Sequence, residues 1–256
     1  MLELKGIRKY YNPGTINEMC LFEGFNFAIQ AGDFVSVVGS NGSGKTSMLN
    51  IICGSIEIES GDILIDGESI ARDKEFKRNC KIGRVYQNPA LGTCPSMTIQ
   101  ENMSLADNKG KLYGLGRGNN KVRANHYKEL LHTLNLGLED KMDVKVGALS
   151  GGQRQAMALL MSTMTPIEFL ILDEHTAALD PKTAEIIMEL TDKIVKEKKL
   201  TTIMVTHNLR YAVEYGNRLV MMHQGKCILD KEKKKEEVNI EELLNLFNEI
   251  SIECGN

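Results

Sequence analysis

A glycine-rich stretch that follows a short apolar segment limits the possible folds of this chain more than any other feature. Residues 39–46 read GSNGSGKT and match the pattern G-x-x-x-x-G-K-[ST] at every position. Residues 34–38 have the composition of a short buried strand, and residues 46–52 that of a helix start. A strand, a glycine loop and a helix in this order are the context of a phosphate-binding loop. An ordinary glycine turn is the alternative, although an accidental match is expected in only about one such chain in a hundred.

The residue types of this loop indicate what it binds. Glycines let successive backbone N–H groups turn toward an anion at the N-terminus of a helix. The ammonium group of Lys45 is placed to meet the β- and γ-phosphates of a nucleotide, and the hydroxyl of Thr46 is placed to ligate Mg²⁺. We therefore predict that the nucleotide is held by consecutive residues of this stretch, namely Gly39, Ser40, Asn41, Gly42, Ser43, Gly44, Lys45, Thr46 and Ser47.

Two adjacent carboxylates follow a second apolar segment. Residues 169–174 read FLILDE, so Asp173 and Glu174 lie at the carboxyl end of a predicted strand, where ligands bind in open α/β sheets. Successive side chains diverge at this point, which lets the two acids serve different roles. Asp173 suits the Mg²⁺ shell, and Glu174 suits orienting or deprotonating an attacking water. A solvated strand end is the alternative for this pair taken alone.

The second half of the chain alternates strands and helices. Residues 169–172 are apolar enough for the centre of a parallel sheet, residues 183–198 have apolar positions at helical spacing, and residues 201–206 read as another strand. This alternation predicts an α/β core with helices on both faces. Residues 61–67 are predicted to form a strand at a sheet edge, and Asn239 with Glu242 predicts a last helix through residue 247.

Composition excludes several other classes of protein. The chain has 256 residues, of which 42% are hydrophobic and 25% charged, with a net charge of −3, so a nucleic-acid coat is not expected. None of the six cysteines forms a CxxC pair, and no apolar run approaches the roughly 20 residues of a membrane span. The scattered thiols and the lack of an apolar signal core predict a reducing, cytosolic compartment. The basic stretch at 108–123 is expected to be a solvated loop, with lipid headgroups or a partner as the alternative contact.

A third motif carries a resemblance to a known family. Residues 149–155 read LSGGQRQ and resemble the signature sequence of the ABC ATPases. Further family motifs match in order along nearly the whole chain. Gln87 in VYQNP resembles the Q-loop glutamine, which contacts Mg²⁺ or water and senses the γ-phosphate. Asp180 ends AALD, which resembles the D-loop, and His207 in VTHN resembles the switch histidine.

This resemblance implies a fold and a site. The implied fold is α/β: a phosphate-loop NTPase core with a mainly parallel sheet, an N-terminal antiparallel β subdomain and an inserted α-helical subdomain. It implies that Tyr11, with Tyr10 as the alternative, stacks on the adenine of ATP. The implied catalytic residues are Lys45, Gln87, Glu174 and His207; those contacting Mg²⁺ are Thr46, Gln87 and Asp173; and the nucleotide also meets Ser150, Gly151, Gly152, Gln153 and Asp180.

The signature also implies a dimer. Ser150 and the glycines after it open a helix and so create a second anion site on the chain. In the family this site faces the γ-phosphate held by the other protomer, so two copies close head to tail around two ATP molecules. The expected organisation is a single ABC ATPase domain over 1–256, with residues 1–87 and 165–230 as catalytic core and β subdomain, residues 88–164 as the helical subdomain, and residues 231–256 as a helical tail.

Two departures from the family pattern are visible. His175 stands where the family most often has proline, and the helix after the signature lacks the family's arginine-containing stretch. The sequence DEHTAALDP is similar to ATPase subunits of importers that use a separate binding protein, including a group linked to aromatic amino acids. We therefore favour a transport ATPase that acts from the cytoplasmic side of the membrane, with separately encoded permease subunits and a substrate-binding protein as partners and no nucleic acid.

Two other functions fit the sequence less well than transport does. Non-transport members of the family that act on chromosomes or in DNA repair carry coiled coils or zinc inserts between the two motifs, and translation factors carry two ATPase halves. Here about a hundred residues separate the motifs, without heptads or cysteine pairs. A module that binds nucleotide without hydrolysis is disfavoured by the intact Lys45, Asp173, Glu174 and His207.

Overall fold

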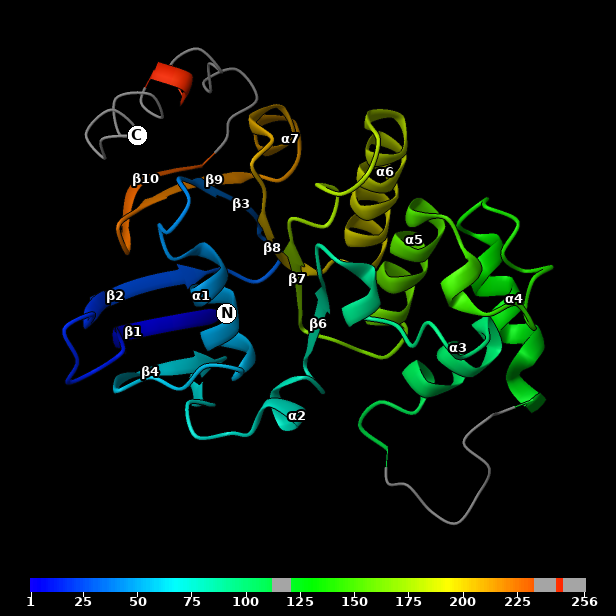
Figure 1. The fold of residues 1–256 in the computed structure, drawn as a ribbon, viewed down its shortest axis with the longest axis horizontal. Coiled ribbons are helices and arrows are strands. Elements are labelled where there is room, and N and C mark those ends of the chain that lie inside the picture. The colour runs from blue at the N-terminus through cyan, green and yellow to red at the C-terminus, as the bar shows by residue number, and fades with distance from the viewer. Residues whose placement is uncertain (112–120, 233–242, 246–256) are drawn as a thin grey trace. The chain divides into compact units, whose positions relative to one another are not determined.

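The computed structural model describes residues 1–111, 121–232 and 243–245, which form two compact units (Figure 1). The first unit contains Met1–Asn79 and the chain from Lys199 onward, and the second contains Cys80–Lys198. The predicted last helix over 239–247 lies outside the described residues except for 243–245, which are helical. Residues 112–120 of the basic stretch also lie outside the described residues.

An antiparallel sheet forms one part of the first unit. Its strands lie in the order β2-β1-β4-β5, and their bounds are Leu2–Tyr11 (β1), Met19–Ile29 (β2), Ser60–Ile65 (β4) and Glu68–Ser69 (β5). Along β1, Leu2 and Leu4 are buried while Glu3 and Lys5 are not, so one face of the strand packs into the core. The prediction that β4 is an edge strand was wrong, because the two-residue β5 pairs with its outer side.

The strand before the phosphate loop lies in a second sheet of the first unit. The strands follow the order β10-β9-β3-β8, with bounds Phe34–Gly39 (β3), Thr201–Val205 (β8), Arg218–His223 (β9) and Lys226–Glu232 (β10). Strand β3 is parallel to both of its neighbours, and β10 is antiparallel to β9. Every residue of β3 and β8 is buried, as expected for parallel strands covered on both faces. The helices of this unit are Lys45–Cys53 (α1), Glu75–Arg78 (α2) and Leu209–Glu214 (α7).

The second unit combines a pair of parallel strands with a helical core. Ile82–Val85 (β6) pairs with Phe169–Asp173 (β7). The helices are Ile99–Asp107 (α3), Ala124–His132 (α4), Gly151–Ser162 (α5) and Pro181–Lys198 (α6), with 3-10 turns at Pro89–Leu91 (η1), Lys121–Arg123 (η2) and Val146–Ala148 (η3). Tyr127 of α4 is completely buried in this core, and its hydroxyl donates to Asp107 of α3 at 2.9 Å. This hydrogen bond joins two helices that flank the undescribed part of the basic stretch.

The predicted α/β fold is confirmed, and most element bounds differ from the predicted ones by one or two residues. The difference at α6 has a clear physical reason. This helix begins at Pro181, whereas the sequence predicted a start at residue 183. Proline is favoured at the first position of a helix because the N–H that it lacks would have no partner inside the helix. The preceding Asp180 accepts a hydrogen bond from the backbone N–H of Thr183 at 3.1 Å, as a cap does.

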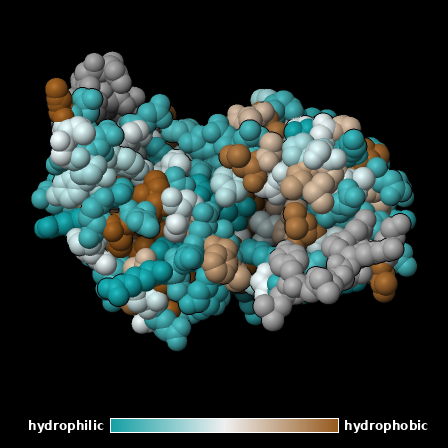
Figure 2. Space-filling model, turned by 60° about the horizontal axis from the view of Figure 1, so that its bottom comes forward, coloured by the Kyte–Doolittle hydropathy of each residue, from teal (hydrophilic) through white to brown (hydrophobic). Residues whose placement is uncertain are grey.

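The surface carries no continuous apolar band in the view of Figure 2, which shows small hydrophobic patches separated by hydrophilic side chains. The exposed large hydrophobic side chains include Ile16, Phe76, Leu91 and Val122. Across the described ranges, none of the helices has the length and apolar character that a membrane crossing requires.

Candidate functional site

The predicted phosphate loop connects β3 to α1 in the first unit. The Lys45 side chain is only 5% exposed and folds back across the loop, where its Nζ donates to the carbonyls of Gly39 and Ser40, both at 2.8 Å. Gly44 precedes the first turn of α1 and has no side chain that could cap it, so the N–H groups of that turn are available to an anion. The loop thus places a buried cation beside a helix N-terminus, which suits a phosphate.

Two glycines of the loop cannot be replaced without a rearrangement. A Cβ at Gly39 would lie 2.1 Å from the backbone carbonyl oxygen of Met222 in β9, so the neighbouring strand would have to move. Gly44 has φ 100°, a backbone conformation that side chains rarely adopt, and a Cβ there would lie 3.0 Å from the ring of Phe22. The close approach of β9 and β2 therefore fixes the glycine pattern of the loop.

Tyr11 lies beside the first turn of α1. Its hydroxyl is 3.0 Å from Oγ of Ser47, the residue after the end of the phosphate-loop motif, and Nζ of Lys9 lies 5.8 Å from its ring centroid. Tyr10 faces the other side of the strand because successive side chains alternate. A hydrogen bond with Cys20 is the main cause of a raised pKa of Tyr10. A hydrogen bond thus holds Tyr11 against the phosphate-loop helix, whereas the hydrogen bond of Tyr10 joins it to the neighbouring strand β2.

His207 lies at the same sheet edge as the phosphate loop. Strands β3 and β8 are parallel and pair Val37 with Val205, so Gly39 and His207 each follow a paired residue by two positions. His207 is exposed, and the next residue, Asn208, caps α7 by accepting from the backbone N–H of Tyr211 at 3.3 Å. The sheet register and this cap therefore place the imidazole at the carboxyl edge, where the loop begins.

The second unit holds the acidic strand end. Strands β6 and β7 pair Val85 with Leu172, so Gln87 and Glu174 also occupy equivalent positions two residues beyond a parallel pair. Glu174 has φ 50°, a left-handed conformation that costs a residue with a side chain on the order of 1–3 kcal/mol. Its carbonyl accepts from the N–H of Ala177 at 2.9 Å, which closes a turn directly after the strand. The register thus brings Gln87 and the two acids to one edge of this unit.

Two further residues, which were not predicted from the sequence, hold this edge of the second unit in place. Nη2 of Arg84 in β6 donates to Oδ2 of Asp173 at 2.7 Å. Gln155 of α5 is 1% exposed and donates to the carbonyl of Tyr86 at 3.0 Å, which fixes the residue before Gln87. The local signal for this contact is a charged residue, Arg84, within the otherwise uncharged strand sequence IGRV, where a buried charge needs a partner.

The signature residues form the start of α5. Ser150 and Gln153 make a capping box, in which each side chain accepts from the other residue's backbone N–H at 3.2 Å. Gly152 is buried, and a Cβ there would lie 2.3 Å from Cγ2 of Thr183 in α6. Ser150 and Gly151 are exposed. The motif therefore has a packing role at Gly152 and an accessible helix N-terminus at Ser150.

Asp180 is exposed, and its hydrogen bonds to Thr183 are the main cause of a lowered pKa of its carboxyl group. This contact gives the residue a structural role at the start of α6. The predicted nucleotide residues are therefore divided between the units. The first unit holds Tyr11, the loop and His207, and the second holds Gln87, the signature, the acid pair and Asp180.

His175 is buried directly after the acid pair. It is 2% exposed, and burial lowers the pKa of its imidazole from 6.5 to about 4, so the ring is neutral at neutral pH. Its Nε2 lies 3.2 Å from Oγ1 of Thr191 in α6, and that hydroxyl donates to the carbonyl of Ile187 at 2.7 Å. Because the hydroxyl proton is already used, His175 donates through Nε2–H. This hydrogen bond anchors the residue that follows the strained Glu174.

The predicted Mg²⁺ contacts are all oxygen donors, namely a hydroxyl, an amide and a carboxylate. Among the residues that the structure describes, no group of three or more His, Cys, Asp or Glu side chains could form a metal cage. This composition fits Mg²⁺, which is commonly held by one or two protein oxygens together with substrate phosphates and water. Thr46 is exposed at the start of α1, and the carboxylate of Asp173 ends β7.

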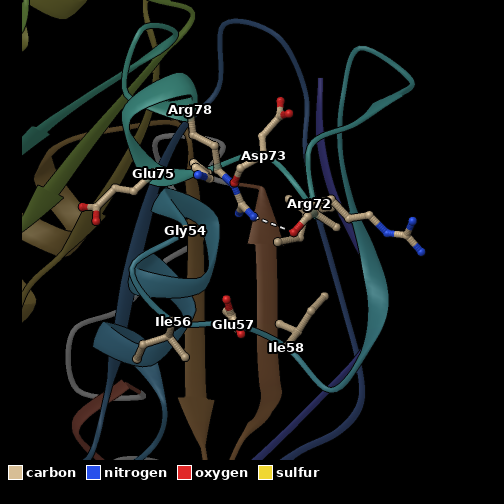
Figure 3. A pocket seen from close by; sticks show the side chains of 11 residues that line it. Gly54, Ile56, Glu57, Ile58, Arg72, Asp73, Glu75 and Arg78 are labelled. Carbon is tan, nitrogen blue, oxygen red and sulfur yellow. Dashed lines mark hydrogen bonds between the residues drawn. The ribbon is translucent and has the colours of Figure 1, made fainter.

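A cavity of about 460 Å³ in the first unit has a different set of lining residues (Figure 3). It is lined by residues of the loop after α1 and of the segment around α2, including Glu57, Asp73 and Arg78. The Arg78 guanidinium donates to backbone carbonyls of Ile51 and Ala71, both at 2.8 Å. Arg78 therefore ties the end of α1 to the segment before α2, and none of the predicted nucleotide residues lines this cavity.

The fold and these residues define a phosphate-loop ATPase of the α/β class. Residues 22–177 match the family described as ABC transporter. The chain belongs to this family, and it is the ATP-binding, ATP-hydrolysing subunit of such a transporter, as the sequence predicted.

Known proteins resemble the chain over nearly its whole length. A tyrosine transport ATP-binding protein of Clostridioides difficile is 49% identical over 253 residues, covering 96% of this chain and 98% of the relative. A xylose/arabinose import ATP-binding protein of Sulfolobus acidocaldarius is 30% identical over 98% of this chain and 95% of its own length. A dimeric ATP-binding cassette solved in a post-hydrolysis state with ADP and Pi has a TM-score of 0.76 at 30% identity, covering 91% of this chain and 98% of that one.

Proposed function

We propose that two copies of this chain associate head to tail around two Mg-ATP, and that closing and opening of this dimer drives import of a small solute. The main supporting observation is that the chain carries two helix starts suited to anions on two different units. One follows the phosphate loop, and the other follows Ser150, where Ser150 and Gly151 are exposed, as contact with a second copy requires. The dimeric form of a similar cassette, solved with ADP and Pi, also supports this arrangement.

The phosphates are held in this proposal by the loop over 39–46 and by the ammonium group of Lys45. Thr46, Gln87 and Asp173 would hold Mg²⁺, which neutralises negative charge on the phosphates when it is bound. Lys45 would leave its loop carbonyls for phosphate oxygens, which are stronger acceptors because they are charged.

The remaining residues would act around the γ-phosphate and the base. Glu174 orients or deprotonates the attacking water, and His207 contacts the γ-phosphate from the edge that it shares with the loop. Ser150, Gly151, Gly152 and Gln153 present their helix N-terminus to the phosphates held by the other copy. Tyr11 stacks on adenine beside α1, and Asp180 lies near the second copy in the closed dimer.

The chain would act at the cytoplasmic surface of the membrane with separately encoded permease subunits and a substrate-binding protein. Residues 88–164 would form the helical subdomain that meets the permease, and residues 231–256 a C-terminal tail. The 49% identity to a tyrosine transport ATP-binding protein supports an aromatic amino acid as the solute. Deletion of the gene should abolish uptake of labelled tyrosine in the source organism, and undiminished uptake would contradict this choice of solute.

The dimer can be tested with Glu174→Gln, which keeps the size of the side chain and removes its basicity. We expect this variant to bind ATP, lose most turnover and elute at twice the 28.5 kDa of the chain when ATP is present. Glu189→Gln, at an exposed position of α6, is the matched control and should keep wild-type turnover. A monomer with and without ATP, together with full turnover, would refute the role of Glu174.

A further inference from the structure

An arginine in the middle of β6 is paired with the strand-end aspartate. Arg84 pairs in register with Ile171 of β7, so its side chain lies on the same face as Asp173, two residues further along β7. Nη2 of Arg84 is 2.7 Å from Oδ2 of Asp173, and the two side chains are only 8% and 12% exposed. A contact this short between two largely buried charges is a fixed feature of the second unit.

The guanidinium is also held from a second side. Its Cζ lies 4.6 Å from the ring centroid of Tyr86, which is a stacking contact between a cation and an aromatic face. The backbone of Tyr86 is in turn fixed by Gln155 of α5. Arg84 is therefore restrained by the ring as well as by the carboxylate, so its charge stays close to Asp173 even when another cation approaches.

We propose that Arg84 is a built-in counter-ion of Asp173 that competes with the divalent cation for this carboxylate. Before Mg-ATP binds, the guanidinium neutralises Asp173 at the strand end. When Mg-ATP binds, the cation shares the carboxylate with a second positive charge, which weakens its hold on the metal. Arg84 is then a positioning residue that favours metal release after each turnover.

This inference rests on the proposed role of Asp173 as a Mg²⁺ residue. The inference can be distinguished from a purely structural role of the ion pair. Loss of a structural pair would lower the stability of the unit without changing how nucleotide binding depends on the metal. The quantity that separates the two is the ratio of the ATP dissociation constant in EDTA to that in saturating Mn²⁺. By linkage, this ratio equals the affinity of Mn²⁺ for protein-bound ATP divided by its affinity for free ATP.

The test measures this ratio by equilibrium dialysis with labelled ATP for the wild type, Arg84→Gln and Arg84→Lys. Gln removes the charge and keeps an N–H donor, whereas Lys keeps the charge. We expect Arg84→Gln to raise the ratio about tenfold, because removing a nearby like charge strengthens cation binding, and Arg84→Lys to stay within about twofold of the wild type. A ratio in Arg84→Gln that is unchanged or lower would overturn the proposal.

Two further variants keep the test decisive. If circular dichroism shows that Arg84→Gln does not fold, Tyr86→Leu decides, since without the ring the guanidinium is free to move away from Asp173 when the cation approaches. A raised ratio in Tyr86→Leu then supports the competition, and an unchanged ratio overturns it. Asp173→Asn should lower the ratio in any case. If Asp173→Asn leaves the ratio unchanged, the proposed role of Asp173 is wrong. The inference about Arg84 is then wrong too, whatever ratios the Arg84 variants give.

Discussion

The buried imidazole of His175 makes the stability of this protein depend on pH in a defined window. In the folded chain the pKa of His175 is about 4, against 6.5 for an unburied histidine. Between these values the unfolded chain binds a proton that the folded chain does not, so stability falls as the pH falls from 6.5 toward 4. Above 6.5 the ring is neutral in both states, and its full contribution is present.

The size of this effect follows from the two pKa values. The whole difference, from 6.5 to about 4, corresponds to roughly 3 kcal/mol of unfolding free energy. At pH 5 the unfolded histidine is almost fully protonated and the folded one is not, so about 2 kcal/mol of that amount is already lost. The cause is the transfer of a charged ring out of water, since His175 is 2% exposed.

His175→Gln isolates this contribution. Glutamine does not titrate, and its amide N–H can replace the Nε2–H donor to Oγ1 of Thr191. Unfolding by urea, followed by circular dichroism at pH 7.5 and pH 5, gives the loss of stability for each protein. The wild type should lose about 2 kcal/mol more than the variant, because the other histidines titrate in both proteins.

Equal losses in the two proteins would refute this reasoning. Imidazole resonances of the wild type provide a direct check. They should show His175 as the neutral Nε2–H tautomer at pH 5, and a doubly protonated ring at that pH would contradict the burial on which the argument depends.

Two glycine positions give further predictions. Gly152→Ala should lower stability by about 1–3 kcal/mol in thermal unfolding, because its Cβ would lie 2.3 Å from Cγ2 of Thr183. The added change Thr183→Ser removes that methyl group and should recover much of the loss; no recovery would contradict the contact. Gly39→Ala should abolish measurable ATP binding in equilibrium dialysis, because its Cβ would lie 2.1 Å from the carbonyl oxygen of Met222, and near-normal affinity would contradict the fixed loop geometry.

The parts of the fold that could be predicted from sequence depend on local patterns. The apolar run before Gly39 became a fully buried parallel strand, and the acid pair came directly after another one. Strand order could not be read in the same way. The edge position predicted for β4 was wrong because the strand that covers it, β5, has only two residues and leaves no recognisable pattern.

The supporting contacts of the site could not be predicted because their partners are distant in sequence. Arg84 and Asp173 are 89 residues apart and meet only because β6 and β7 are paired. His175 and Thr191 are 16 residues apart and meet only where α6 packs beside the end of β7. Asp180 is the opposite case, because an aspartate before a proline is a local signal for a helix start, and the cap on α6 could have been recognised.

The central claim is that ATP is bound and hydrolysed through the phosphate loop between β3 and α1. The most direct test is the Mg²⁺-dependent release of phosphate from ATP by the purified wild type and by Lys45→Ala, with the exposed Lys74→Ala as the control. We expect Lys45→Ala to lose about a hundredfold or more of the rate, since charge stabilisation at the phosphates is removed, and Lys74→Ala to match the wild type. Hydrolysis by Lys45→Ala at the wild-type rate would contradict the account.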